Sequence, residues 1–251
     1  PKGYLHNIRR LCDEYEILLI IDDVFCGFGR TGKMFSFEHE NIIPDIFTVS
    51  KSLGGGKGSI AAYIAKDEIY KKAYGDIKNY MIHSTTFNGF GEECYTAIEA
   101  INIIIDENLV DNSHLMGKYI RSELNILKSK YPKIIKNVRG IGLLNGIELN
   151  NPSKKIISSL GIGIPFFKDL GQNILPGIIL SQLFYRYNIL LTSGVHSANL
   201  IVINPALIVT KEDIDYLINS LDDYFSNGFV GMLTNYGKMK ISSTITYLYS
   251  P

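Results

Sequence analysis

The chain has 251 residues, of which 46% are hydrophobic, and its 25 Lys and Arg residues balance 25 Asp and Glu residues. This composition suits one large domain or two smaller ones with a hydrophobic core, and the absence of a basic block argues against nucleic acid as a partner. The three cysteines are scattered without metal-ligand spacing, and no apolar stretch is long enough to span a membrane, so we expect a cytoplasmic protein without a metal.

The first elements in chain order alternate between helix and strand. Apolar residues on one face of 3–16 predict a helix, and apolar, β-branched runs predict strands at 17–24, 46–49 and 59–65. The strand at 46–49 is expected to be buried in a parallel sheet. A short surface helix is expected at 66–74.

The rest of the chain begins with two predicted helices, at 91–109 and 111–130, before the break at Pro132. Strands are then expected at 134–140, 142–149, 189–192 and 200–203, with a turn at 150–153 and helices at 178–187 and 211–225, and Thr210 as the cap of the last helix.

Two apolar runs end in charged residues. The run that starts at Ile17 leads into Asp22, and the run Ile46–Val49 ends just before Lys51 and a group of three glycines at 54–56. If the two strands are parallel neighbours, the carboxylate and the amine lie at the same edge of the sheet, where open α/β sheets bind ligands. Two chemistries need this arrangement: phosphate binding by a lysine in a glycine loop, and a Schiff-base lysine beside an aspartate that pairs with a pyridinium nitrogen.

The phosphate-loop interpretation fails on detail. A phosphate loop places its lysine directly before Ser or Thr and then begins a helix, whereas Lys57 is followed by Gly58 and by a predicted strand. Lys57 is therefore interpreted as a solvated loop lysine. The Schiff-base interpretation of Lys51 fits better, and the alternative for a lysine standing alone is an exposed residue at a strand end.

Three motifs in order carry a family resemblance. Residues 22–32 (Asp-Asp-Val-Phe-Cys-Gly-Phe-Gly-Arg-Thr-Gly), 83–87 (His-Ser-Thr-Thr-Phe) and 138–148 (Val-Arg-Gly-Ile-Gly-Leu-Leu-Asn-Gly-Ile-Glu) resemble signatures of class III aminotransferases. The resemblance covers about residues 1–225. It implies a pyridoxal-phosphate enzyme of fold type I, with a mostly parallel sheet and helices on both faces, followed by a small α+β domain.

The resemblance also implies the roles of four residues. Lys51 would bind the cofactor as a Schiff base and act as the catalytic base, Asp22 would pair with the pyridinium nitrogen, and Val24 would pack on one face of the ring. Thr86 would reach across a homodimer interface to the cofactor phosphate of the neighbouring subunit. The alternatives are caps of a helix or turn for Asp22 and Thr86.

Two departures from the family pattern stand out, one that concerns the tuning of the cofactor ring and one that concerns the expected substrate. Phe25 stands where many members have a glutamine near the phenolic oxygen of the cofactor, and Val202 stands where many have an arginine that binds a substrate carboxylate. A valine cannot bind a carboxylate. The substrate end there would therefore lack a carboxylate, another residue would supply the charge, or function has been lost.

The resemblance predicts three regions: 1–131 as the C-terminal part of the cofactor-binding domain, 132–225 as a small domain, and 226–251 as a linker or the start of a further region. It also predicts a fragment without the N-terminal half, where the family has its phosphate loop and its stacking aromatic residue. The leading expectation is amino transfer between a primary amine (a diamine, an ω-amino acid or a biosynthetic intermediate) and a carbonyl acceptor. The alternatives are an aminomutase or decarboxylase on the same fold, a non-catalytic dimerising remnant, and a plain α/β ligand-binding domain.

Overall fold

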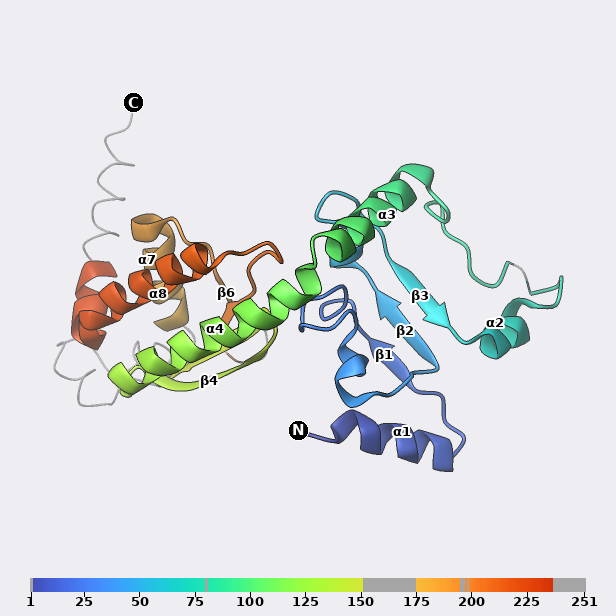
Figure 1. The fold of residues 1–251 in the computed structure, drawn as a ribbon, viewed down its shortest axis with the longest axis horizontal. Coiled ribbons are helices and arrows are strands. Elements are labelled where there is room, and N and C mark those ends of the chain that lie inside the picture. Colours follow the sequence, from blue (N-terminus) through green and yellow to red (C-terminus); the bar gives the residue numbers. More distant parts are fainter. Residues whose placement is uncertain (1, 80, 151–174, 195–196, 198, 237–251) are drawn as a thin grey trace, which may run out of the picture. The chain divides into compact units, whose positions relative to one another are not determined.

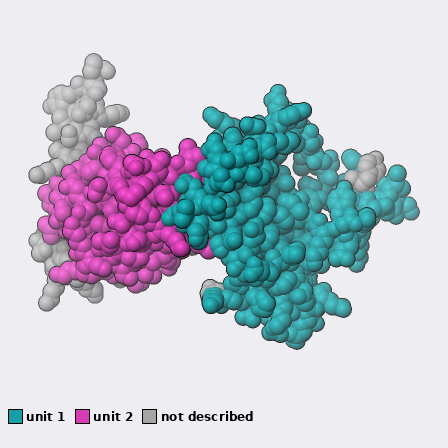
Figure 2. Space-filling model, in the orientation of Figure 1, with its two compact units in different colours: residues 1–115 teal, residues 116–251 magenta. Residues whose placement is uncertain are grey.

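The computed structural model describes residues 2–79, 81–150, 175–194, 197 and 199–236. The chain divides into two compact units, residues 1–115 and residues 116–251 (Figure 2). Helix α4 (Leu109–Lys130) contributes to both. The domain boundary expected after residue 131 stays a prediction.

Unit 1 contains a three-stranded sheet in the order β1 (Ile20–Asp22), β2 (Ile46–Val49) and β3 (Ala62–Ala65) (Figure 1). Strands β1 and β2 are parallel, as the argument about the strand ends required, whereas β3 is antiparallel to β2. Asp22 therefore ends β1, and Lys51 lies just after the carboxyl end of its parallel neighbour β2.

Strands β1 and β3 are shorter than the sequence predicts. Strand β3 begins at Ala62 instead of residue 59, and β1 is shortened at both ends. The N–H of Ile17 donates to the carbonyl of Cys12, which closes helix α1 (Tyr4–Glu14), so the chain becomes a strand only at Ile20. At the other end, the N–H of Val24 turns back to the Asp22 carboxylate. The prediction of a buried β2 is also only partly right, because Val49 is buried and the other three residues are half-buried.

The two faces of β1 differ in burial. Leu19 and Ile21 face a small core with Phe37 and Ile42, onto which α1 packs its predicted apolar face. Because side chains alternate along a strand, the opposite face carries Ile20, which is 59% exposed, and the exposed Asp22. Asp22 thus lies on the open face of the sheet.

Asp45 ties three parts of unit 1 together. Its carboxylate is buried and accepts hydrogen bonds from Arg9 of α1, from the N–H of Leu19 and from Lys66 after β3, each at 2.7 Å. Burial alone would raise the pKa of this carboxyl, but the three donors outweigh it and lower the pKa from 3.8 to about 2. The residue fixes the start of β2 against its neighbours.

The glycine run after Lys51 has a packing reason. Lys51 begins the short 3₁₀ helix η2 (Lys51–Gly54), which packs on α3 (Gly91–Asp106). Gly55 has a φ of +58°, and a Cβ there would lie 3.0 Å from the Cβ of Ala100. Glycine therefore allows both the left-handed turn and the close approach. Between β3 and α3 lie the expected surface helix, α2 (Asp67–Tyr74), and a long loop (Figure 1).

Unit 2 is built on an antiparallel sheet in the order β4-β5-β7-β6. Its strands are β4 (Ile135–Ile141), β5 (Leu144–Leu149), β6 (Thr192–Ser193) and β7 (Leu200–Ile203). Helices α4, α7 (Leu175–Tyr187) and α8 (Lys211–Ser226) pack fully buried side chains such as Leu124, Leu183 and Leu221 against Ile147 and Ile201 of the sheet. Antiparallel strands and helices agree with the small α+β domain expected here.

Unit 2 corrects two sequence predictions. Helix α7 begins at Leu175 rather than 178, and the strand expected at 189–192 is instead the two-residue β6. Residues 228–236 belong to the region for which the sequence predicts a linker or the start of a further region; they are helical, and Phe229 and Met232 belong to the core of this unit. The Thr210 cap is confirmed, since its hydroxyl accepts the N–H of Asp213. The turn expected at 150–153 lies, apart from Asn150, outside the described residues.

The motif at 138–148 folds as the β4–β5 hairpin. Gly142 turns the chain with a φ of +51°, and its carbonyl accepts a hydrogen bond from Arg121 of α4 at 2.8 Å. A Cβ on Gly117 of α4 would lie only 2.0 Å from that carbonyl, so the helix passes directly over the turn. These glycines serve packing and not chemistry.

Candidate active site

Asp22 is oriented by two donors. Its Oδ1 atom accepts the N–H of Val24 at 3.1 Å and the hydroxyl of Thr48 at 3.3 Å, and Thr48 is its register partner on β2. Its Oδ2 atom has no protein donor among the described residues. One carboxylate oxygen is thus held by the sheet edge and its turn, and the other is open to a ligand on the exposed face.

Lys51 stands at the same edge of the sheet, after β2. Its backbone has a φ of 44°, the left-handed region that few non-glycine residues adopt. The preceding residue, Ser50, is tied by its hydroxyl to the carbonyl of Ile60 at 3.0 Å. The Lys51 side chain is exposed, and its Nζ atom lies 5.2 Å from the centroid of the Phe25 ring.

Asp23, which is 1% exposed, fixes the turn that follows β1. Its N–H donates to the carbonyl of Thr48 at 3.0 Å, its carbonyl accepts the N–H of Gly27 at 2.8 Å, and its Oδ2 accepts the N–H of Ser36 at 2.9 Å. A Cβ on Gly27 would lie 2.9 Å from the Asp23 carbonyl. The turn therefore holds Val24, which is half-buried, and Phe25 at a set place beside β2.

The pKa of the Cys26 thiol depends on the charged residues of this site. Burial raises the pKa of its thiol; Asp23 and Asp22 raise it further, while Arg30 and Lys51 lower it. The charges of Asp22 and Lys51 are thus both within electrostatic reach of one thiol. The raised pKa keeps Cys26 protonated near neutral pH, which does not suit a nucleophile.

Thr86 lies away from these contacts, in the loop between α2 and α3. The residues from Met81 to Phe90 are all exposed, and the Thr86 side chain has no hydrogen-bond partner within the described part of the chain. Only the beginning of the motif is tied to the sheet, because the His83 ring lies 6.2 Å from that of Tyr63 on β3. The structure places Asp22, Val24 and Lys51 at one edge of the sheet, and among the described residues no hydrogen bond or ring contact joins Thr86 to them.

Sequence reasoning missed Thr48 and Tyr63. Thr48 faces Asp22 on one side and Tyr63 on the other in the strand register, so the three side chains form one row across the sheet. The spacing of Thr48, three residues before Lys51, was the available signal. The identity of its partner needed the register.

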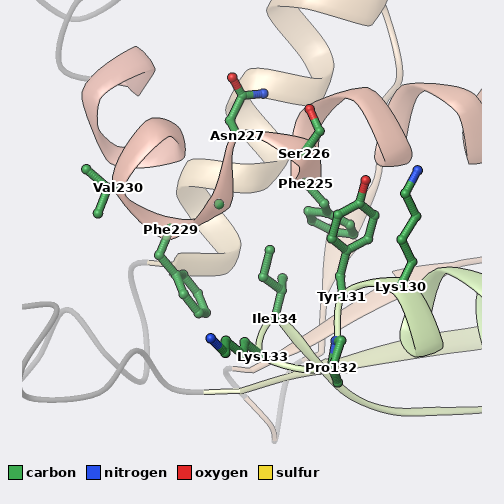
Figure 3. Close-up of a pocket in the computed structure, with 11 residues that line it drawn as sticks. Lys130, Tyr131, Pro132, Lys133, Ile134, Phe225, Ser226, Asn227, Phe229 and Val230 are labelled. Carbon is green, nitrogen blue, oxygen red and sulfur yellow. The ribbon is translucent and has the colours of Figure 1, made fainter.

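A separate pocket of about 550 Å³ lies in unit 2 (Figure 3). Its lining is mostly apolar, and it contains none of the residues that the sequence singles out for chemistry. The lining residues are Lys130, Tyr131, Pro132, Lys133, Ile134, Phe225, Ser226, Asn227, Gly228, Phe229 and Val230. Across the ranges that the structure describes, no cluster of three or more His, Cys, Asp or Glu residues could hold a metal ion, and no helix is long and apolar enough to cross a membrane.

Comparison with known proteins assigns the chain to a family. The family model for class III aminotransferases matches residues 1–225. The chain belongs to the class III aminotransferase family.

Solved structures agree with this assignment. An S-selective transaminase from Arthrobacter sp., solved with alanine bound, is 30% identical over 91% of this chain, with a TM-score of 0.75. The ornithine aminotransferase from Toxoplasma gondii ME49 is 26% identical over 95% of this chain, with a TM-score of 0.72. An (S)-enantioselective ω-transaminase from Thermomicrobium roseum is 27% identical over 90% of this chain, with a TM-score of 0.73.

The match covers only part of those proteins. The chain spans 48% of the first two structures and 47% of the third, about half of their length. The fold class expected from the sequence, a fold type I aminotransferase with a large α/β domain and a smaller α+β domain, is confirmed.

Proposed function

We propose that the protein transfers amino groups with pyridoxal 5'-phosphate. The observation that carries the proposal is the common edge of β1 and β2, where Asp22 and Lys51 follow parallel strands. The residues fit the cofactor: Lys51 offers an exposed amine, and Asp22 presents an open Oδ2 atom held in place through Oδ1. When bound, the cofactor supplies an aldehyde that reacts with amines and a ring that accepts electrons.

Each residue has a defined task in this proposal. Lys51 holds the cofactor through Nζ and, once free, moves a proton at that atom. Asp22 Oδ2 would accept a hydrogen bond from the protonated pyridine nitrogen, and a charged hydrogen bond of this kind is stronger than a neutral one. Val24 would pack on one face of the ring.

The same proposal includes a homodimer in which Thr86 binds the phosphate of the neighbouring subunit. Its support is the number of exposed apolar side chains in the segment that carries Thr86. Phe87 is 77% exposed, Tyr95 78% and Ile77 84%, and large apolar side chains left exposed are often covered at an interface. A cytoplasmic setting remains part of the proposal.

The substrate is proposed to be a primary amine that does not need a carboxylate-binding arginine: a diamine, an ω-amino acid or a biosynthetic intermediate. The support is Val202, which stands where many family members have an arginine. Val202 lies on β7 and is register partner to Gly146, so its place in the sheet is set by backbone pairing. An aliphatic side chain cannot form the bidentate pair that a carboxylate needs.

The test is conversion of the cofactor by amine donors. The complete protein, loaded with pyridoxal phosphate, is mixed separately with a diamine, an ω-amino acid and an α-amino acid, and the absorbance of the aminated cofactor is followed. Transamination predicts conversion by at least one donor and its reversal by a carbonyl acceptor. Release of carbon dioxide or an isomerised amine would instead identify a decarboxylase or aminomutase, and no reaction with any donor would favour the non-catalytic remnant.

A further inference from the structure

We propose that Phe25 is a positioning residue for Lys51. The face of its ring holds the Lys51 ammonium group at the edge of the site. The proposal deepens the proposed function and rests on Lys51 being the amine of that site. Its geometric basis is the distance of 5.2 Å between Lys51 Nζ and the centroid of the Phe25 ring. A cation within about 6 Å of an aromatic centroid is attracted by the negative face of the ring.

The ring is carried by a fixed turn. Phe25 lies within the turn that the Gly27 N–H closes onto the Asp23 carbonyl at 2.8 Å, and Asp23 is itself buried and bonded to β2 and to Ser36. The turn therefore has little freedom to carry Phe25 away from β2. A phenyl ring attached to such a turn is a constant feature of the site.

The lysine, in contrast, has a fixed backbone and a free side chain. Its positive φ of 44° sets the direction in which the chain leaves the strand end. The four-carbon stem is flexible. Within the described residues Nζ lies against the ring of Phe25 and forms no hydrogen bond or ion pair. Phe25 thus supplies a restraint that the backbone does not.

The side chain of Phe25 is 41% exposed, and it is not among the residues that pack on the small core of unit 1. Its neighbour Phe28 is 5% exposed and packs edge to face on Phe35. Phe25 therefore contributes little to the core of unit 1, so a role at the site edge accounts for its position better than packing does.

The test measures acylation of Lys51 without cofactor. The complete protein receives a brief pulse of acetic anhydride at constant pH, and the labelling of Lys51 is measured by mass spectrometry relative to Lys57 of the same molecule. Lys57 is exposed and lies beyond the glycine run, so it serves as the internal reference. Acylation requires the uncharged amine, and a ring that holds the ammonium slows it.

Phe25→Leu keeps an apolar side chain but removes the ring face, and it should raise the labelling of Lys51 relative to Lys57 by roughly two- to five-fold, the range expected for an exposed cation–π contact. Phe25→Tyr keeps the ring and should restore the labelling of the wild type. Tyr70→Leu, which removes another exposed aromatic side chain of unit 1, should leave the ratio unchanged.

An unchanged ratio in Phe25→Leu, or the same increase in Phe25→Tyr, would overturn the proposal. Circular dichroism of each variant shows whether the overall fold is retained. An acylation rate of Lys57 equal to that of the wild type shows that the structure around this residue is retained as well. Because the experiment contains no cofactor, its failure is distinct from failure of the proposed function, which is read from amine donors and the loaded protein.

Discussion

Replacement of Asp45 by asparagine should destabilise unit 1 in a way that depends on pH. The buried carboxylate accepts three hydrogen bonds, two of them from the cations Arg9 and Lys66. Its pKa is lowered from 3.8 to about 2 in the folded protein. Converted at about 1.36 kcal/mol for each pKa unit, this shift corresponds to roughly 2 kcal/mol of stability at neutral pH.

The direction with pH follows from the lowered pKa. The contribution is fully present above the unfolded pKa of 3.8 and is lost as the pH falls toward the folded value of about 2. Asp45→Asn should therefore lower the free energy of unfolding by about 2–3 kcal/mol at pH 6, since two cations also lose their buried partner. The difference from the wild type should shrink steadily below pH 4.

The assay is urea unfolding followed by circular dichroism at pH 6, 4 and 3, with hydrogen exchange of the Leu19 amide as the local reading. Asp13→Asn is the matched control, because Asp13 pairs with the same Arg9 at 2.7 Å but its side chain is 66% exposed. An exposed pair of this kind contributes less than about 1 kcal/mol. Equal losses in the two variants, or a loss in Asp45→Asn that does not change with pH, would refute the reasoning.

Three further predictions concern single hydrogen-bonding groups. Thr48→Val removes the donor to Asp22 and should weaken pyridoxal phosphate binding by roughly three- to ten-fold in a fluorescence titration, whereas Thr48→Ser should retain the affinity; equal affinity for Val and Ser would assign Thr48 no part in orienting Asp22. Tyr224→Phe removes a buried hydroxyl that has no hydrogen-bond partner among the residues that the structure describes, and it should leave thermal stability unchanged or raise it by up to about 1 kcal/mol; a clear loss of stability would mean that the hydroxyl is satisfied. Thr210→Ala removes the cap of α8 and should cost about 1 kcal/mol in urea unfolding, while Thr210→Ser should not; a loss in both variants would point to packing instead of capping.

The sequence predicted those parts of the fold that depend on local patterns. The apolar face of α1, the strand β2 and the Thr210 cap follow from spacing and residue type within a few neighbours, and the structure confirms them. The end of β1 was predicted too late because the chain turns after Asp22: the Val24 N–H donates to the Asp22 carboxylate, and the Gly27 N–H donates to the Asp23 carbonyl.

The residues of the candidate site also divide into those that local sequence patterns predict and those that depend on the fold. Asp22 and Lys51 were predicted because strand ends and glycines are visible in the sequence, and the parallel pairing of β1 and β2 then brings them to one edge. Thr48 and Phe25 could not be predicted as their partners, since one contact depends on strand register and the other on a turn closed by backbone hydrogen bonds. The roles of Lys51, Asp22, Val24 and Thr86 stay predictions.

The most direct test of the account is the position at which the protein binds pyridoxal phosphate covalently. The complete protein and its Lys51→Ala variant are incubated with the cofactor, reduced with borohydride, digested and mapped by mass spectrometry. The account predicts a reduced adduct on Lys51, none on the exposed Lys57, and none at either position in Lys51→Ala. An adduct on Lys57, or equal labelling of the wild type and the variant, would contradict the assignment of Lys51 as the amine of the site.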